Sequence, residues 1–369
     1  MNRLKPLDTI RGVAAIIVAF FSHYHHFDHA MAADAQPFYS FLGFFYENGW
    51  HMVDLFFVLS GVVFSYVYGR KIFQQRIDAR EYSVYRFSRL YPLHLATLIF
   101  VSALFLYGIA KGIGIFVYTQ SDTNYFLANV LFIQSGVTPW PWTFNGPAWS
   151  ISCEIVAYIM FFVIMRYFFR MRVVISVGLI VIGFLFRHLH TGYFFVNMDI
   201  GRLFMGFFLG ILIYEVLFYE KLKTWHFGLI VAGLLAGFAA VMYVKPSAWS
   251  YTYVVFLYPA FIIASIRFAP LNKLLSIRPL TYLGDISYSV YLLHFPVQLL
   301  IYSIAVAGGL HFPYTSPLFF LFYGGAVVAV SVVSYEYFEK PVQMILRKRL
   351  LAEKKISPKV TAPVQQEVV

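Results

Sequence analysis

The chain has 369 residues, of which 60% are hydrophobic and only 12% are charged, and its mean hydropathy is +0.70. This composition excludes an ordinary soluble fold and indicates a multi-pass membrane protein. The formal net charge of +11 does not indicate a nucleic-acid partner, because the basic residues lie between the apolar segments. A single cysteine, Cys153, excludes an internal disulfide and is expected to be a packing residue.

Ten apolar segments are long enough to cross a membrane as helices of about 17–25 residues. They lie near residues 10–30, 51–69, 93–110, 149–166, 173–188, 200–219, 226–244, 250–267, 283–305 and 316–338. The first segment is interpreted as a retained span, since others of its kind follow it. A shorter apolar segment at 124–136 is expected to be interfacial or re-entrant. The sequence therefore predicts an all-α polytopic bundle of about ten transmembrane helices.

The distribution of lysine and arginine predicts the orientation of this bundle. If the N-terminus is cytoplasmic, 24 of the 28 Lys and Arg residues fall in cytoplasmic segments, as the positive-inside rule requires. We therefore expect both termini in the cytoplasm and an even number of spans. The membrane domain is expected to cover residues 1–341, and residues 342–369 are expected to form a disordered cytoplasmic tail.

The first span carries a cation at its start and an imidazole deep within it. Arg11 is either a snorkelling anchor or a phosphate ligand at the membrane surface. His23 lies twelve residues further on, or about 18 Å along a helix, where a core histidine and a general base are both reasonable interpretations. His25, His26 and His29 follow it. We expect these three to be an interfacial polar cluster and expect no metal site, because Asp28 is the only supporting carboxylate nearby.

The second span and the loop after it supply further candidates. Asp54 could orient a histidine or bind a sugar hydroxyl, and Ser60 beside Gly61 forms a small pair that lets helices pack closely. Arg86 and Arg89, placed in the first cytoplasmic loop, share one helix face because they are three residues apart. Two guanidinium groups on one face suit phosphate oxygens, although they are also typical of positive-inside clusters.

The fourth and ninth spans bring rare polar groups into the membrane. Glu154 lies about one and a half turns inside the fourth span, with Trp149 at its start. His294 lies at mid-depth in the ninth span, and Tyr288 and Tyr291 share a face of the same helix. We expect the two histidines and the carboxylate to meet inside the membrane, where ionisable groups usually serve a function.

These motifs, in this order, resemble the acyltransferase family 3 membrane proteins, which O-acylate bacterial surface polysaccharides. The resemblance extends from about Leu7 to Pro341. Its motifs are Arg11-Gly12 with His23, FFVLSG at 56–61, RFSRLYP at 86–92, WSISCE at 149–154, GDISY at 284–288 with YLLH at 291–294, and EKP at 339–341.

The resemblance implies a membrane O-acyltransferase that uses cytoplasmic acyl-coenzyme A, usually acetyl-coenzyme A, as a co-substrate with no tightly bound cofactor. The acceptor would be a carbohydrate hydroxyl, as in an O-antigen, an exopolysaccharide or a lipid-linked sugar. Arg11, Arg86 and Arg89 would bind the donor phosphates. His23, Glu154 and His294 would be catalytic. Asp54, Ser60, Trp149, Tyr288 and Tyr291 are the candidates for substrate binding.

Two other classes remain open at the level of sequence. Intramembrane histidine and glutamate also mark proton-coupled transporters, although the two halves of the chain show no clear repeat. A scaffold that binds anionic lipid headgroups would explain the arginines but not His23, Glu154 and His294.

Overall fold

The computed structural model describes residues 3–113, 116–118, 122–138, 141–189, 193–245 and 249–352. Within these ranges the chain is helical, and its only β-type pairing is an isolated bridge between Tyr193 and Val196. Nine of the described helical segments are long and apolar enough to cross a membrane, and a tenth results if a pair bent by 92° counts as one span. The predicted all-α, multi-pass membrane fold is therefore confirmed.

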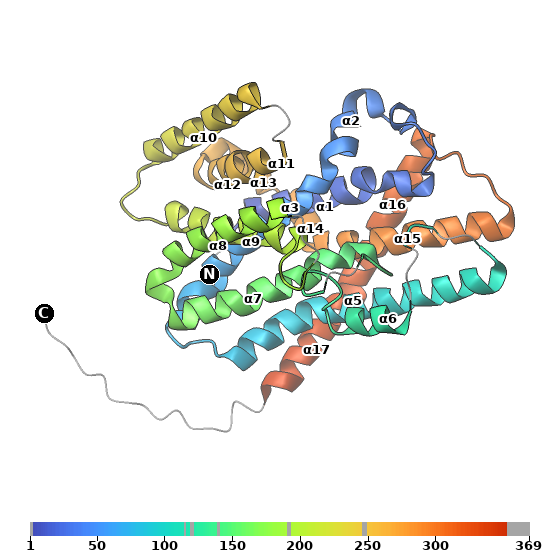
Figure 1. Ribbon diagram of the computed structural model, residues 1–369, viewed down its shortest axis with the longest axis horizontal. Coiled ribbons are helices and arrows are strands. Elements are labelled where there is room, and N and C mark those ends of the chain that lie inside the picture. The colour runs from blue at the N-terminus through green and yellow to red at the C-terminus, as the bar shows by residue number, and fades with distance from the viewer. Residues whose placement is uncertain are drawn as a thin grey trace, which may run out of the picture.

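Figure 1 colours the helices by their order along the chain. They are α1 Lys5–Ile17, α2 Tyr39–Asn48, α3 Met52–Phe64, α4 Arg70–Phe73, α5 Ala79–Lys111, α6 Thr123–Val130, α7 Trp149–Tyr167, α8 Arg172–Leu189, α9 Met198–Leu217, α10 Thr224–Val244, α11 Trp249–Thr252, α12 Tyr258–Arg267, α13 Ala269–Leu275, α14 Arg278–Asp285, α15 Ser287–Gly308, α16 Pro317–Ser334 and α17 Lys340–Leu351. Turns of π-helix at Val18–Ser22, Ser65–Gly69, Tyr253–Leu257 and Tyr335–Glu339 adjoin α1, α3, α12 and α16.

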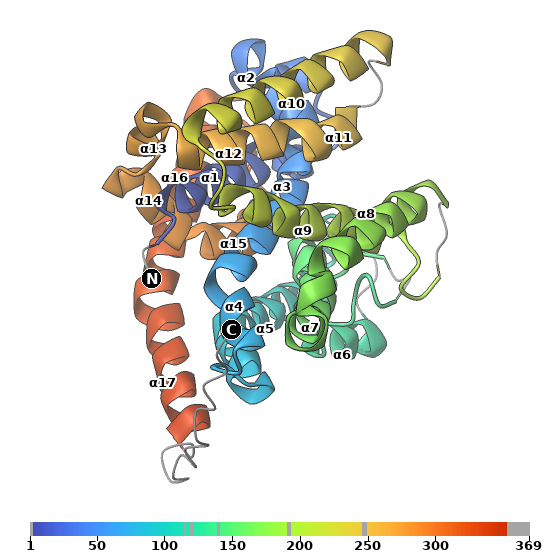
Figure 2. The same ribbon diagram turned by 90° about the vertical axis from the view of Figure 1, so that its left-hand side faces the viewer.

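Helix α1 lies inside the bundle, where it contacts α3, α14 and α15. Helices α10 and α12 pack on each other at one end of the molecule, whereas α5 and α17 pack together at the other end (Figures 1 and 2). Helix α15 packs against both α1 and α5, and α3 packs against both α1 and α9. The central position of α1 places its polar residues among groups from several spans.

Glycines let α1 and α3 approach their neighbours closely. A Cβ atom added to Gly12 would lie 2.6 Å from the backbone of Gly284, and one added to Gly284 would lie 2.1 Å from the Asp8 carbonyl oxygen. Gly61 on α3 and Gly210 on α9 form a similar crossing, with added Cβ atoms 2.0 and 2.2 Å from backbone oxygens of the opposite helix. These contacts exclude side chains at both crossings and fix α1 and α3 at the centre of the fold.

Two boundaries differ from the sequence-based expectation. The span expected near 93–110 starts earlier, because α5 begins at Ala79 with Asp78 as its N-cap and continues through Pro92. Helix α17 continues to Leu351, where a tail was expected from residue 342. It packs along α5, and Arg347 Nε donates a hydrogen bond to Ser88 Oγ at 3.1 Å. Residues 353–369 of the expected tail lie outside the described residues.

Candidate active site

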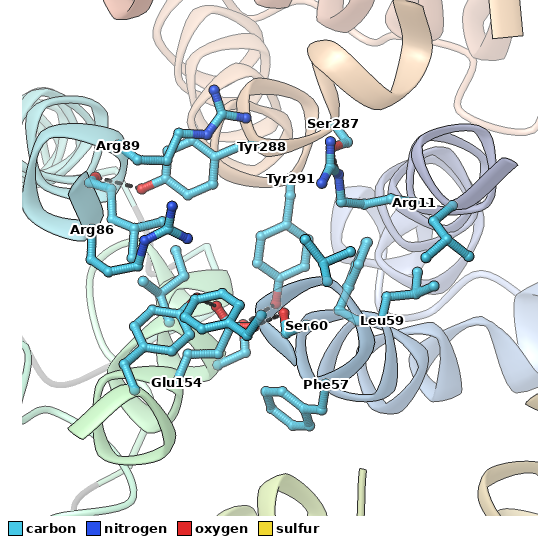
Figure 3. Close-up of a pocket in the computed structure, with 18 residues that line it drawn as sticks. Arg11, Phe57, Leu59, Ser60, Arg86, Arg89, Glu154, Ser287, Tyr288 and Tyr291 are labelled. Atoms are coloured by element: carbon cyan, nitrogen blue, oxygen red, sulfur yellow. Dashed lines mark hydrogen bonds between the residues drawn. The ribbon is translucent and has the colours of Figure 1, made fainter. Parts of the chain in front are cut away.

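A small cavity of about 160 Å³ lies between α1, α3, α5, α7 and α15 (Figure 3). Its lining includes all three arginines predicted to bind phosphate, together with Ser60, Glu154, Tyr288 and Tyr291. Arg11 reaches the cavity from α1, whereas Arg86 and Arg89 reach it from α5 on the other side. Segments that are distant in sequence therefore converge on one cationic, largely apolar-walled site.

Arg11 is held in place by the helices that cross at Gly12. Its Nε donates a hydrogen bond to Ser287 Oγ at 3.0 Å, and one terminal nitrogen donates to the Gly284 carbonyl oxygen at 2.8 Å. The same nitrogen lies 3.2 Å from a carboxylate oxygen of Asp8. These contacts fix the direction of the guanidinium group while leaving it at the cavity wall.

Arg86 and Arg89 lie one helical turn apart on α5. Arg86 donates a hydrogen bond to the Tyr68 hydroxyl at 2.9 Å, and its guanidinium carbon lies 4.8 Å from the centre of the Phe64 ring. Its Nε is buried and has no hydrogen-bond partner among the described residues. The Arg89 guanidinium lies 5.8 Å from the Tyr288 ring. Aromatic rings thus orient both cations, and Arg86 keeps an unused donor that an anionic ligand would satisfy.

Glu154 forms the polar floor of the cavity. One carboxylate oxygen accepts a hydrogen bond from Ser60 Oγ at 2.7 Å, and the other accepts one from the Tyr158 hydroxyl. Ser60 and Glu154 therefore meet across the contact between α3 and α7, although neither described bond of Glu154 goes to a histidine. Sequence analysis overlooked Tyr158, which its position four residues after Glu154 on one helix could have revealed.

His23 and His294 meet as expected and form a direct pair. His23 Nδ1 lies 2.7 Å from His294 Nε2, and the two rings are nearly parallel, with an angle of 17° between their planes and their centres 5.0 Å apart. His23 follows the π-helical turn Val18–Ser22, at the point where the first span loses its α-helical geometry. Such turns are frequent at functional sites. The side-chain amide of Gln298 donates to the His23 carbonyl oxygen at 2.9 Å, which fixes the backbone at this break.

Tyr291 is near both the cavity and this histidine pair. It lines the cavity, and its ring centre is 6.1 Å from that of His294. Its hydroxyl is hydrogen-bonded to Ser150 Oγ at 2.9 Å, and its ring packs edge-on against Phe56 at 5.5 Å. The histidines are not part of the cavity lining, so the structure separates the Glu154 group from the histidine pair that was expected to join it.

Two other predicted substrate-binding residues lie outside the cavity. Asp54 is buried, and its carboxylate accepts a hydrogen bond from Arg202 Nε at 2.8 Å. The Trp149 ring lies 4.9 Å from the Arg202 guanidinium and stacks on Trp142. Both residues therefore contribute to a buried charged layer between α3, α7 and α9, a location that their positions in the sequence did not indicate.

Comparison with known proteins identifies the family. A family model described as an acyltransferase domain, that of acyltransferase family 3, matches residues 5–336. The chain belongs to acyltransferase family 3. This acyltransferase is also 31% identical over 172 residues to "Protein 2 in picA locus" of Rhizobium radiobacter, a match that covers 42% of the chain and 78% of the relative. No solved structure matches the chain.

Family membership makes the protein an enzyme that transfers acyl groups, which removes the need for the transporter and scaffold interpretations. The match begins before Arg11 and ends within the π-helical turn that follows α16, so every residue of the cavity lies inside it. The cavity and the adjoining histidine pair are therefore the candidate active site of this acyltransferase.

Proposed function

We propose that this acyltransferase moves an acyl group, acetyl in the simplest case, from cytoplasmic acyl-coenzyme A to a hydroxyl of a surface or lipid-linked carbohydrate in the bacterial inner membrane. The main support is the convergence of Arg11, Arg86 and Arg89 on one small cavity whose wall residue Tyr291 lies near His294 of the His23–His294 pair. Guanidinium forks suit phosphate oxygens, and a buried imidazole pair suits proton transfer from a hydroxyl.

The three arginines would hold the phosphates of the donor. The cavity of about 160 Å³ is smaller than the roughly 300–1,000 Å³ of sites that enclose drug-sized ligands. It therefore suits a thin, flexible group such as the pantetheine arm, while the nucleotide end would stay at the mouth beside the arginines. Acyl-coenzyme A would act as a diffusing co-substrate.

The histidine pair has one arrangement of protons that its hydrogen bonds favour. His294 Nδ1 lies 3.2 Å from the Val290 carbonyl oxygen, which only accepts, so this nitrogen carries a proton. In a neutral ring His294 Nε2 is then an acceptor, and His23 Nδ1 must donate to it. His23 Nε2 is left with a free lone pair. His294 would thus act as a positioning residue that makes His23 Nε2 the base.

Direct transfer passes the acyl group from the sulfur of the donor to the hydroxyl oxygen of the acceptor. His23 Nε2 removes the proton from the acceptor hydroxyl while its oxygen forms a bond to the thioester carbonyl carbon. The carbon–sulfur bond then breaks, and the leaving thiolate takes the proton from His23, so an ester and free coenzyme A result. In the covalent alternative, His23 Nε2 attacks the carbonyl carbon, the carbon–sulfur bond breaks, and the thiolate takes the proton that the acylated ring gives up. The acceptor hydroxyl oxygen then attacks the acyl carbon, the carbon–nitrogen bond breaks, and the hydroxyl proton returns to the His23 ring.

Glu154 and Tyr291 would prepare the site for this step. Glu154, oriented by Ser60 and Tyr158, offers carboxylate oxygens to donor or acceptor groups in the cavity. Because Tyr291 lines the cavity and its ring centre lies 6.1 Å from that of His294, we expect the thioester to pass this ring on its way to His23. The hydrogen bond from Tyr288 to the Leu90 carbonyl oxygen ties α15 to α5 and supports the wall that carries Arg89.

Coenzyme A binding tests the donor half of the proposal. The protein in lipid nanodiscs should bind coenzyme A in a calorimetric titration, and Arg86→Ala combined with Arg89→Ala should weaken binding by about a hundredfold or more, since each charged hydrogen bond is worth about 1.5–3 kcal/mol. Arg170→Ala is the matched control, because Arg170 is exposed and lies outside the cavity. Equal affinity in the double variant and the control would refute the assignment of the phosphate site.

The acceptor half of the proposal is tested in cells. Deleting the gene should remove acyl esters from one class of surface glycan, which mass spectrometry detects as the loss of whole acyl increments. Complementation with the wild-type gene should restore them, and complementation with His23→Ala should not. An unchanged glycan profile after deletion would refute a carbohydrate acceptor without affecting the coenzyme A result.

A further inference from the structure

Three histidines form a cluster immediately after the first span, next to the proposed base. His25 and His26 lie on the short 3₁₀ turn Tyr24–Phe27, and His29 follows two residues after it. One ring nitrogen from each histidine lies within 4.8 Å of the other two. His25 and His29 are exposed, whereas His26 is more buried and its ring stacks on that of His23 at 5.2 Å.

The spacing of the three nitrogens is close to what one metal ion needs. For three points no more than 4.8 Å apart, a centre exists within about 2.8 Å of all of them. Zinc–imidazole bonds are about 2.0–2.1 Å long, so each nitrogen would have to move inward by less than about 1 Å. Rotation about the side-chain bonds of His25 and His29 can supply this movement, because both side chains are exposed.

The hydrogen bonding of His26 and His29 leaves one ring nitrogen of each available to a ligand. His26 Nδ1 is buried and has no hydrogen-bond partner among the described residues, an arrangement that is costly unless something binds it. His29 Nε2 lies 3.3 Å from the Phe116 carbonyl oxygen, which can only accept. Since His29 Nε2 then carries the proton, its Nδ1 is free to coordinate. A backbone carbonyl that accepts from the second ring nitrogen is one of the common supports of a metal-binding histidine.

We propose that His25, His26 and His29 bind one divalent transition-metal ion of the zinc class. Three imidazole donors without a carboxylate favour zinc over magnesium or calcium, which prefer oxygen ligands. Three protein ligands leave a fourth position for water or a hydroxyl. The expectation of an interfacial polar cluster rested on the scarcity of carboxylates, but an all-histidine site does not need one.

Zinc binding to the purified protein tests this site without any assay of acyl transfer. The full chain, purified with an affinity tag that contains no histidine, is stripped with a chelator, placed in nanodiscs and titrated with zinc chloride. Bound zinc is then counted by elemental analysis after dialysis. We expect about one zinc ion per chain. Cobalt(II) should bind in its place and give the visible absorption bands of a tetrahedral site.

Variants distinguish the cluster from other histidines. His25→Ala and His29→Ala should each weaken zinc binding by about tenfold or more, and the double variant should abolish stoichiometric binding. His311→Ala, at an exposed position elsewhere, should bind zinc as the wild type does. Circular dichroism and gel filtration verify folding, and His25→Gln with His29→Gln gives a second pair if the alanine variants misfold. Absence of stoichiometric zinc in the wild type, or wild-type affinity in a folded double variant, would overturn the proposal.

Discussion

Replacing His294 by leucine should slow acyl transfer without weakening coenzyme A binding. The substitution removes the acceptor of His23 Nδ1, whose distance to His294 Nε2 is 2.7 Å. His23 then lacks the contact that fixes its ring and its proton arrangement. Because His294 lies outside the cavity that holds the arginines, the donor site should be unaffected.

The size of the effect follows from the lost hydrogen bond. An unsatisfied buried donor costs about 1–3 kcal/mol, and each 1.4 kcal/mol corresponds to about a tenfold change in rate. We therefore expect His294→Leu to reduce transfer by about 5- to 150-fold. His294→Gln should lose less, because its side-chain oxygen can accept from His23 Nδ1. His23→Ala should lose most, about 10²- to 10⁴-fold, since it removes the base itself.

The assay is the initial rate at which labelled acetyl groups from acetyl-coenzyme A enter base-labile esters in membranes from a strain that lacks the chromosomal gene. Gel filtration and coenzyme A affinity verify that each variant is folded. Since the two histidines are proposed to act as one unit, the His23→Ala, His294→Leu double variant should be no slower than His23→Ala alone. A wild-type rate in His294→Leu, or a multiplicative loss in the double variant, would refute the reasoning.

Three further outcomes follow from the structure. Asp54→Asn should lower the free energy of unfolding by about 3 kcal/mol, because it removes the carboxylate that is ion-paired with the buried Arg202 guanidinium. The thermal midpoint in detergent should fall accordingly, and a midpoint equal to that of the wild type would contradict this. Gly12→Ala should destabilise by about 1–3 kcal/mol, since the new Cβ would meet the Gly284 backbone at 2.6 Å, whereas Gly178→Ala meets no atom within 4 Å and should be tolerated. Saturating zinc should slow acyl transfer severalfold and a chelator should restore the rate, because a dication on the histidine cluster opposes protonation of His23. An unchanged rate would argue against this effect on His23, and the zinc stoichiometry would still decide whether the cluster binds metal.

Much of the fold followed from local sequence properties. Apolar length and the scarcity of charges predicted the spans and the all-α class, because hydrocarbon requires every backbone polar group to be satisfied within a helix. The start of α5 had a local signal as well, since the Asp78 side chain caps the helix by accepting from the Glu81 backbone N–H. The burial of Tyr82 and Leu90, by contrast, depends on tertiary packing that no local pattern shows. The placement of both termini in the cytoplasm stays a prediction.

The sequence by itself determined which residues are too costly to lie in a membrane without a purpose, and it named Arg11, His23, Glu154 and His294 on that ground. Only the tertiary structure decided how they are grouped. It pairs His23 with His294 and places Glu154 beside Ser60 and Tyr158. It places Asp54 in a buried ion pair with Arg202. The reason is physical: depth along one helix follows from residue spacing, but the direction of a side chain depends on which helices cross and how closely their glycines let them approach.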